Sequence, residues 1–218
     1  MYKEKIRNFF NSNYRNNQYY WWKNENRYSI DKKLHTTYYS QILTEAKKYG
    51  NGKVLDIGAG EGADSIRLAK LGFEIDAVEF SPIAVNKINI NSKRENVSIN
   101  AICCDIEKFT TINFYDIVMC NGVRHYIENK HNIMELMQKH TKIGGINCVS
   151  LFSSFSPIPT CHKIIDVFPD DENGQIETAY SEWKKLLVLY ERDKIENSHD
   201  DMPQHKHSFI KLIARRIK

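Results

Sequence analysis

Short apolar runs alternate with amphipathic stretches along most of this chain, which is typical of an α/β protein. The apolar runs that predict strands lie at 53–57, 73–79, 97–103, 115–120, 146–152, 187–192 and 208–215. Apolar residues at helical spacing predict helices over 36–49, 64–71, 82–90, 132–140 and 180–186. The regular order of strand and helix in the first two thirds of the chain indicates a mainly parallel sheet.

A glycine-rich turn follows the first of these strands. Gly58, Gly60 and Gly62 allow a tight turn and leave no Cβ between the backbone and a ligand. The turn satisfies the loose dinucleotide pattern G-x-G-x-x-G/A, and a nucleotide-like ligand is expected over it. Asp56 favours a different ligand, because its carboxylate would repel a pyrophosphate and attract the ammonium and sulfonium of S-adenosyl-L-methionine. The alternative is that Asp56 only caps backbone amides.

The turn and four later segments resemble, in order, the motifs of the class I S-adenosylmethionine-dependent methyltransferases. Residues 54–62 resemble motif I, two strands then end in an acid, and a segment resembling motif IV precedes a Gly-Gly turn; these later segments are 73–81, 101–106, 114–121 and 143–145. The resemblance implies a single Rossmann-like seven-stranded sheet with strand order 3-2-1-4-5-7-6, the last strand antiparallel, and helices on both faces. It places the methyltransferase domain at 35–218.

The same resemblance implies where the cofactor binds. Glu79, about 20 residues past the turn, is expected to accept hydrogen bonds from both ribose hydroxyls, unless it is only a helix-start acid. Asp105 would accept from the adenine amine beside Ile106, unless it only caps a turn. The predicted cofactor-binding residues are Asp56, Gly58, Ala59, Gly60, Gly62, Glu79, Phe80, Asp105, Ile106, Cys120, Asn121, Trp22 and Arg27. The product would be S-adenosyl-L-homocysteine.

Residues 1–34 are polar, aromatic and rich in asparagine. We expect a lid over the cofactor, with Trp22 stacking on it and Arg27 pairing with a carboxylate. The alternatives are an N-terminal helix packed on the sheet and a contact in a homodimer.

Candidate catalytic residues follow the fourth strand, at the edge where the acceptor should lie. His125 is a candidate general base, Arg124 could hold an anion and Tyr126 could orient an acceptor. The alternative for His125 is structural packing beside the cofactor.

The segments 155–182 and 194–207 are predicted to be loops on the substrate side. Together with the end of the chain they resemble the tellurite-resistance-type subgroup of small methyltransferases, which implies that His199 lies by the active site. Asp200 departs from that pattern, because an arginine would be expected there, and this favours a metabolite or small acid over an oxyanion as acceptor. His205 and His207 share one strand face near His199, but ordinary polar histidines are favoured over a metal site.

Length, charge and cysteine content limit the classes of partner expected for this chain. The length of 218 residues predicts one domain. The formal net charge of +4 is mild, and no basic stripe of the kind that binds nucleic acid is apparent in the sequence. Its apolar runs are shorter than a membrane span, the start is not typical of a signal peptide, and the five cysteines form no C-x-x-C pair. We therefore expect a cytoplasmic methyltransferase acting on a small molecule by in-line displacement. The alternatives are a tRNA or protein methyltransferase and a non-catalytic nucleotide-cofactor-binding module.

Overall fold

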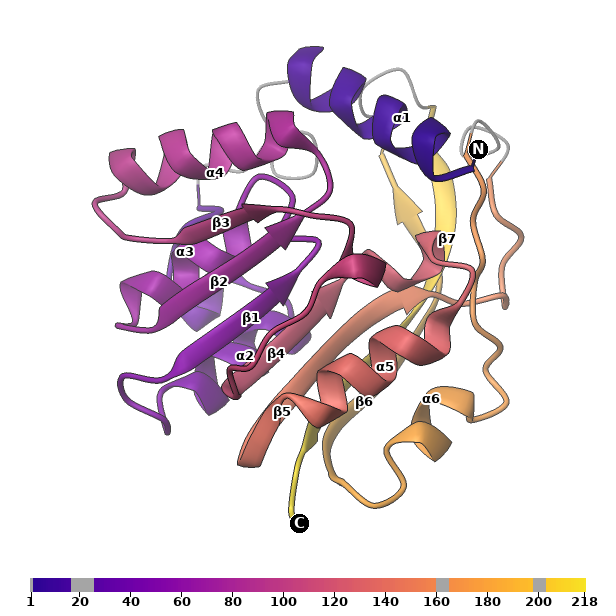
Figure 1. Ribbon diagram of the computed structural model, residues 1–218. Helices are drawn as coiled ribbons and strands as arrows, with labels where there is room; N and C mark the ends of the chain where they lie inside the picture. Colours follow the sequence, from indigo (N-terminus) through magenta and orange to yellow (C-terminus); the bar gives the residue numbers. More distant parts are fainter. Residues whose placement is uncertain (1, 17–25, 160–164, 198–202) are drawn as a thin grey trace.

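The computed structural model describes residues 2–16, 26–159, 165–197 and 203–218. Seven strands within these ranges form one sheet in the order β3-β2-β1-β4-β5-β7-β6 (Figure 1). The strands are β1 (Lys53–Ile57), β2 (Glu74–Glu79), β3 (Asn100–Cys103), β4 (Tyr115–Asn121), β5 (Thr141–Phe152), β6 (Lys184–Glu196) and β7 (His205–Arg215). The first five are parallel, and β7 is antiparallel to both β5 and β6. The predicted fold class and strand order are confirmed.

Helices lie on both faces of the sheet (Figure 1). The α-helices are α1 (Tyr2–Asn16), α2 (Thr37–Ala46), α3 (Ala63–Lys70), α4 (Pro82–Arg94), α5 (Lys130–Lys139) and α6 (Gln175–Ala179), and short 3-10 helices span Lys32–Leu34, Ile106–Lys108 and Arg124–Tyr126. Side chains of α2, α3 and α4 pack on one face, and side chains of α5 and α6 pack on the other. Among the described residues, each helix is too short or too polar to cross a bilayer.

Two hydrophobic cores form because successive strand residues point to opposite faces. In β4, Ile117 and Met119 pack into the core beneath α2, whereas Val118 and Cys120 pack beneath α5. All four side chains are at most 1% exposed. A strand buried on both faces reads as a continuous apolar run, and this is why the central strands could be predicted.

The first helix was not among the predicted helices. α1 packs on the start of α4 through Tyr14 and Phe10, and it lies at the edge of the sheet where the parallel strands end (Figure 1). This corresponds to the alternative of an N-terminal helix, although the helix covers the strand ends and not a sheet face. Trp22 lies outside the described residues.

Two predictions near the end of the chain differ from the structure. The helix predicted over 180–186 is wrong, because α6 ends at Ala179 and the chain enters β6 at Lys184. The loop predicted over 194–207 is shorter than expected, because β6 continues to Glu196 and β7 begins at His205. The end of β6 is polar, and a polar strand is tolerated there because β6 is the edge strand of the sheet and residues 192–195 are exposed.

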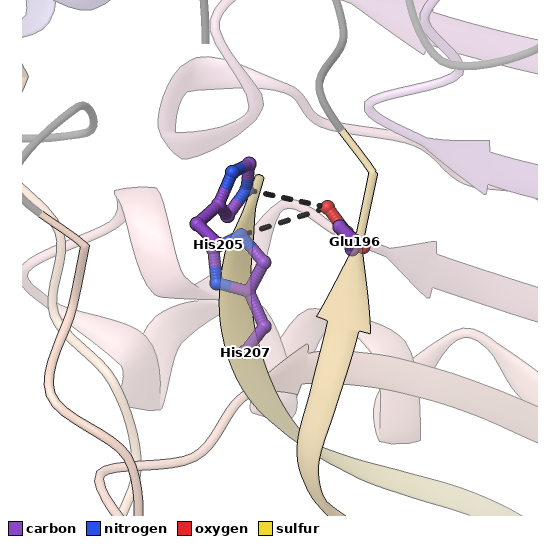
Figure 2. A group of neighbouring side chains, drawn as sticks. All are labelled: Glu196, His205 and His207. Atoms are coloured by element: carbon purple, nitrogen blue, oxygen red, sulfur yellow. Dashed lines mark ion pairs between the residues drawn. The ribbon is translucent and has the colours of Figure 1, made fainter. Parts of the chain in front are cut away.

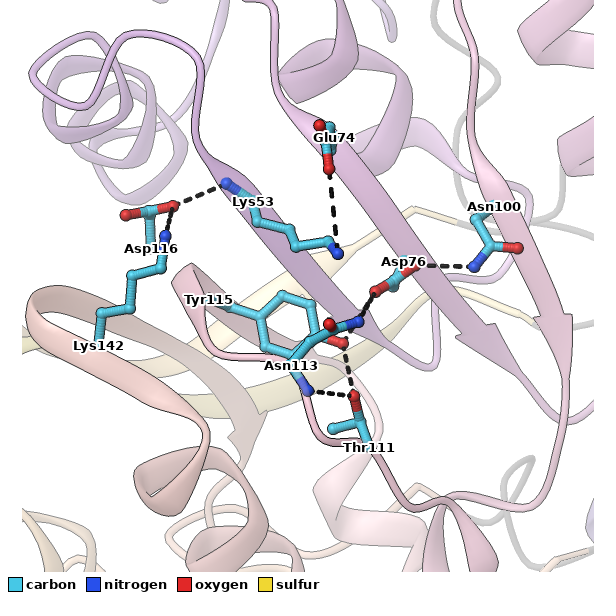
Figure 3. A network of polar contacts seen from close by, with 9 residues as sticks. All are labelled: Lys53, Glu74, Asp76, Asn100, Thr111, Asn113, Tyr115, Asp116 and Lys142. Atoms are coloured by element: carbon cyan, nitrogen blue, oxygen red, sulfur yellow. Dashed lines mark hydrogen bonds and ion pairs between the residues drawn. The ribbon is translucent and has the colours of Figure 1, made fainter.

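A polar network fastens the amino-terminal ends of the strands, opposite to α1 (Figure 3). Asp76 of β2 accepts from Asn100 of β3 at 2.8 Å and from the Tyr115 hydroxyl of β4 at 2.8 Å. Asp116 accepts from the Lys53 backbone amide at 2.7 Å and from Lys142 at 2.9 Å. These carboxylates join five neighbouring strands, from β3 to β5 in the sheet order.

Tyr115→Phe should lower the free energy of unfolding by roughly 1–3 kcal/mol, because it removes a buried donor from the Asp76 carboxylate. Urea denaturation measures the change. Tyr49→Phe is the matched control, since its hydroxyl donates to the Gly144 carbonyl in a solvent-exposed hydrogen bond. An equal loss in the two variants would contradict the role given to Tyr115.

Candidate active site

One cavity of about 480 Å³ opens at the carboxyl-terminal ends of the strands, between the glycine turn and α1. Its size is in the range of small-molecule sites. Tyr2, Lys3, Ile6, Phe10 and Tyr14 of α1 form one wall. The predicted residues that line it are Asp56, Gly58, Ala59, Gly60, Glu79, Phe80, Asp105, Ile106, Asn121, His125 and Tyr126. Most of the predicted cofactor site is therefore brought together in space.

The turn after β1 requires glycine at its first position. Gly58 has φ +67°, and a Cβ there would lie 2.2 Å from the Val123 side chain, which also lines the cavity. Gly62 has a different task, since it is the N-cap of α3 with φ +83° and lies against Ile88. Gly62 thus shapes the helix start and is not part of the cavity wall.

Glu79 is tied to the backbone of two adjoining segments. One carboxylate oxygen accepts from the Gly60 amide at 2.9 Å and the other from the Ser81 amide at 2.8 Å. Burial raises the pKa of Glu79. Each carboxylate oxygen has a second lone-pair site, so the side chain can still accept from two hydroxyl groups in the cavity.

Asp56 lies beneath the turn and is 3% exposed. Its donor is the Ser65 hydroxyl at 2.6 Å and not a backbone amide, so its hydrogen bonding differs from the capping alternative. Burial, together with the negative charge of Asp64, raises the pKa of Asp56 to about 7. A cationic group entering the cavity would favour the ionised form.

Asp64 is a cavity residue that the sequence reasoning missed. It accepts from Asn121 at 2.9 Å and is ion-paired with Arg67, and Asn121 in turn accepts from the Tyr38 hydroxyl at 2.7 Å. This chain fixes the end of β4 against the start of α3. The sequence signal was present, because an acid in the first turn of a helix after a glycine turn is well placed to face a ligand.

Asp105 both caps a turn and faces the cavity. One oxygen accepts from the Glu107 amide at 3.1 Å, and the other accepts from Lys3 of α1 at 2.9 Å. Lys3 is also ion-paired with Glu107. The turn cap that the sequence offered as an alternative is present, and the second oxygen, which Lys3 contacts, keeps another lone pair for a donor at this end of the cavity.

Arg124 points away from the cavity that its neighbours line. It is ion-paired with Asp170, which also pairs with Lys130 at 2.5 Å, and its side chain is 9% exposed. The pairing anchors the segment before α6 to the end of β4. Arg124 therefore lacks the position that anion binding would require.

His125 is fixed by the strand beside it. Its Nδ1 accepts from the Phe152 backbone amide at 3.2 Å, and its ring stacks on the Phe152 ring at 3.9 Å. A backbone amide can only donate, so Nδ1 is unprotonated and the neutral ring carries its proton on Nε2. This tautomer donates a hydrogen bond but does not serve as a proton acceptor, which favours the packing alternative over a general base. Tyr126 packs edge-on against Phe10 of α1 at 5.2 Å and lines the cavity.

Two other predicted residues, Cys120 and Arg27, lie apart from the cavity wall. Cys120 is fully buried within the sheet, and burial raises the pKa of its thiol to about 12, so it is neutral. Arg27 lies over the Tyr28 ring at 4.9 Å, beside α3. His199, like Trp22, lies outside the described residues.

The far end of the cavity is built from β6 and β7. Sequence reasoning placed 194–207 on the substrate side, but as a loop, and it did not assign Phe209 or Lys211 to the site. Lys194, Glu196, Phe209 and Lys211 line this end. Phe209 and Lys211 alternate along β7 and so share a face. That alternation was visible in the sequence, but the pairing that brings β6 beside it was not.

The model of the family described as tellurite resistance protein TehB matches residues 20–212. The chain belongs to the TehB family. It is 24% identical over 183 residues to the probable S-adenosyl-L-methionine-dependent methyltransferase TehB of Haemophilus influenzae (strain 10810), covering 83% of this chain and 63% of that protein. The predicted methyltransferase family is confirmed, and the predicted cofactor is the one in that relative's name.

Solved structures share the fold of this TehB-family chain. The crystal structure of TehB from Haemophilus influenzae superposes with a TM-score of 0.70 at 22% identity, covering 84% of this chain and 64% of that one. The 1,6-didemethyltoxoflavin-N1-methyltransferase of Burkholderia thailandensis, solved with 1,6-didemethyltoxoflavin and S-adenosylhomocysteine bound, gives 0.68 at 14% identity and covers 100% and 89%. The chain spans less than two thirds of the length of the Haemophilus proteins.

Glu79→Gln should weaken binding of S-adenosyl-L-homocysteine by about 10-fold or more, because an amide has only one acceptor oxygen for ribose hydroxyls. Isothermal titration calorimetry measures the change. Glu74→Gln is the matched control, since Glu74 begins the same strand and its side chain is 81% exposed. Equal affinities of Glu79→Gln and wild type would remove Glu79 from the cofactor site.

Binding of S-adenosyl-L-homocysteine should weaken at low pH, because Asp56 stabilises the ammonium group of the ligand only while its carboxylate is ionised. With the pKa of Asp56 near 7, we expect the ratio of wild-type to Asp56→Asn affinity to fall roughly tenfold from pH 8 to pH 6. The ratio cancels the titration of the ligand itself.

The unliganded protein supplies the control. Because folding raises the pKa of Asp56, its contribution to stability is full below about pH 4 and is lost as the pH rises through about 7. The free energy of unfolding of wild type relative to Asp56→Asn should therefore decrease over that interval. A constant difference would show that Asp56 is not a buried titrating acid.

Proposed function

We propose that this chain transfers a methyl group from S-adenosyl-L-methionine to a small organic acid. The observation that carries the proposal is one cavity that has a carboxylate-lined end and a lysine-lined end. Asp56, Glu79 and Asp105 line the first end, and Lys194 and Lys211 line the second. The first set suits a cationic nucleoside cofactor, and the second suits an anionic acceptor.

The lysines support an acid acceptor because both line this end of the cavity, whereas Glu191, the carboxylate that they share, does not line it. Glu191 accepts from Lys211 at 2.6 Å and lies 3.6 Å from Lys194. The Lys211 side chain is 8% exposed, so its charge is only weakly screened by solvent. An anionic group of the acceptor would pair with these ammonium groups, at an end of the cavity whose wall also contains the Glu196 carboxylate.

The proposed reaction is a direct in-line displacement. A lone pair of the acceptor attacks the methyl carbon as the carbon–sulfur bond breaks, and the bonding electrons remain on sulfur as a neutral thioether. The charges on sulfonium and acceptor diminish together, so alignment and exclusion of water are the main tasks of the protein. The Phe10 and Tyr126 rings close the cavity above the reacting groups, consistent with the predicted lid. His125 would orient the acceptor through its Nε2 proton.

The wall that α1 adds also favours a small acceptor over a macromolecule. Ile6, Tyr126 and Ile165 form a buried apolar cluster where α1 meets the rest of the chain. A tRNA or protein side chain would have to displace this cluster.

The four described cysteines are free thiols, which accords with the proposed cytoplasmic location. A homodimer stays a prediction.

The test is formation of S-adenosyl-L-homocysteine from S-adenosyl-L-methionine with a panel of small carboxylic acids and their amides or esters as acceptors. We expect turnover with acids. Lys211→Met should raise KM for the acid about tenfold or more, because a buried charge loses its partner, and should leave S-adenosyl-L-homocysteine affinity unchanged.

Lys142→Met is the matched control for this substitution, since Lys142 pairs with Asp116 at the opposite edge of the sheet. Turnover of the neutral amides at the same rate would contradict an acid acceptor. Methylation of tRNA or protein, without turnover of any small molecule, would overturn the proposed function.

A further inference from the structure

Three side chains of types that can ligate a metal lie close together where β6 ends and β7 begins (Figure 2). Glu196 is paired with His205 across the two antiparallel strands, and His207 follows two residues later on the same face. One ligand atom from each of the three lies within 4.8 Å of the others. The hairpin therefore gathers two imidazoles and one carboxylate in one place.

The hydrogen bonding of His205 determines what its other nitrogen can do. Nδ1 lies 2.7 Å from the Pro203 carbonyl oxygen, which can only accept, so Nδ1 carries the proton. In the neutral ring Nε2 then has an unshared electron pair, and Nε2 lies 3.5 Å from a Glu196 oxygen. The contact between this nitrogen and the carboxylate is favourable when a cation lies between them, and either a proton or a metal ion supplies one. A backbone carbonyl that holds the second nitrogen is also the usual support of a metal-bound histidine.

The distances suit a bound ion better than a direct hydrogen bond. The same Glu196 oxygen lies 3.6 Å from Nε2 of His207, which is longer than the usual N–H···O range of about 2.7–3.2 Å. With Zn–N and Zn–O bonds of about 2.0–2.2 Å, ligand atoms in a tetrahedral site lie roughly 3.3–3.6 Å apart. Both separations match that geometry.

The site is held rigidly and borders the cavity. The His207 ring stacks on Phe152 at 4.4 Å and meets the His205 ring edge-on at 4.6 Å. The two imidazoles are nearly buried, whereas Glu196 is 28% exposed and lines the acceptor end of the cavity. Three protein ligands with a fourth position left for water or substrate is the arrangement of catalytic zinc sites.

We propose that Glu196, His205 and His207 bind one divalent transition-metal ion, with Zn²⁺ the best fit to this nitrogen and oxygen donor set. With neutral imidazoles and one carboxylate the occupied site carries a net single positive charge. Together with Lys194 and Lys211 it would attract an anionic acceptor, a consequence that rests on the proposed function. The metal site itself does not depend on it.

The test is calorimetric titration of the chelator-treated, full-length protein with Zn²⁺ alone. We expect one equivalent to bind, and Glu196→Gln, His205→Gln and His207→Gln each to weaken it by at least the roughly 10–100-fold that loss of a supporting residue costs. His131→Gln is the matched control, because His131 lies 3.0 Å from Glu135 on the solvent-exposed side of α5 and forms an ordinary histidine–glutamate pair. Cys103→Ser controls for binding at an exposed thiol.

Absence of one-equivalent binding by wild type, or binding that survives all three substitutions, would overturn the proposal. If His207→Gln fails to fold, Glu196→Gln decides the outcome, since it keeps the shape of a partly exposed side chain. Co²⁺ absorption gives a second readout, in which imidazole and carboxylate ligation lacks a thiolate charge-transfer band. Unchanged S-adenosyl-L-homocysteine binding in the same variants would separate loss of the metal site from failure of the cofactor site.

Discussion

The candidate site depends on one buried carboxylate, Glu79, that joins two turns. Its two oxygens hold the Gly60 amide and the Ser81 amide, and so connect the glycine turn after β1 to the start of α4. Charge-assisted hydrogen bonds of this kind offset part of the cost of removing a carboxylate from water. The pKa of Glu79 is nevertheless raised by burial, so the charge is incompletely solvated in the unliganded protein. Hydroxyl donors of a ligand would complete its solvation, which links folding of the turns to binding.

The cavity gathers acids at a cost in stability. Burial raises the pKa of Asp56, and the nearby charge of Asp64 raises it further. Nothing in the packing of the sheet requires this, because both cores are apolar and the polar network around Asp76 and Asp116 lies at the opposite edge. Strain of this type is expected where a site must attract a charged ligand. The polar network at the amino-terminal ends of the strands thus stabilises the fold, whereas the buried acids at the carboxyl-terminal ends lower its stability.

The sequence predicted what local pattern determines. Central strands buried on both faces gave unbroken apolar runs, and the glycine turn, Glu79 and Asp105 follow those strands at fixed positions. The position of Arg124 could not be predicted, because its ion-pair partner Asp170 is distant in the chain. The position of Arg27 over the Tyr28 ring could not be predicted either, because an irregular turn sets it. The extension of β6 and β7 was missed because their outer parts are polar. It is this polar extension that brings Lys194 and Glu196 to the cavity.

Phe152 links the two halves of the acceptor end. Its ring lies between the imidazoles of His125 and His207, at 3.9 Å and 4.4 Å, and the three rings are nearly parallel. Its backbone amide sets the tautomer of His125, while its ring limits the rotation of His207. One residue of the central strand β5 therefore orients a hydrogen-bond donor toward the cavity and a candidate metal ligand toward Glu196. Because both orientations follow from the same strand, any shift of β5 against β7 would disturb the acceptor and metal positions together, which makes their relative geometry a property of the sheet.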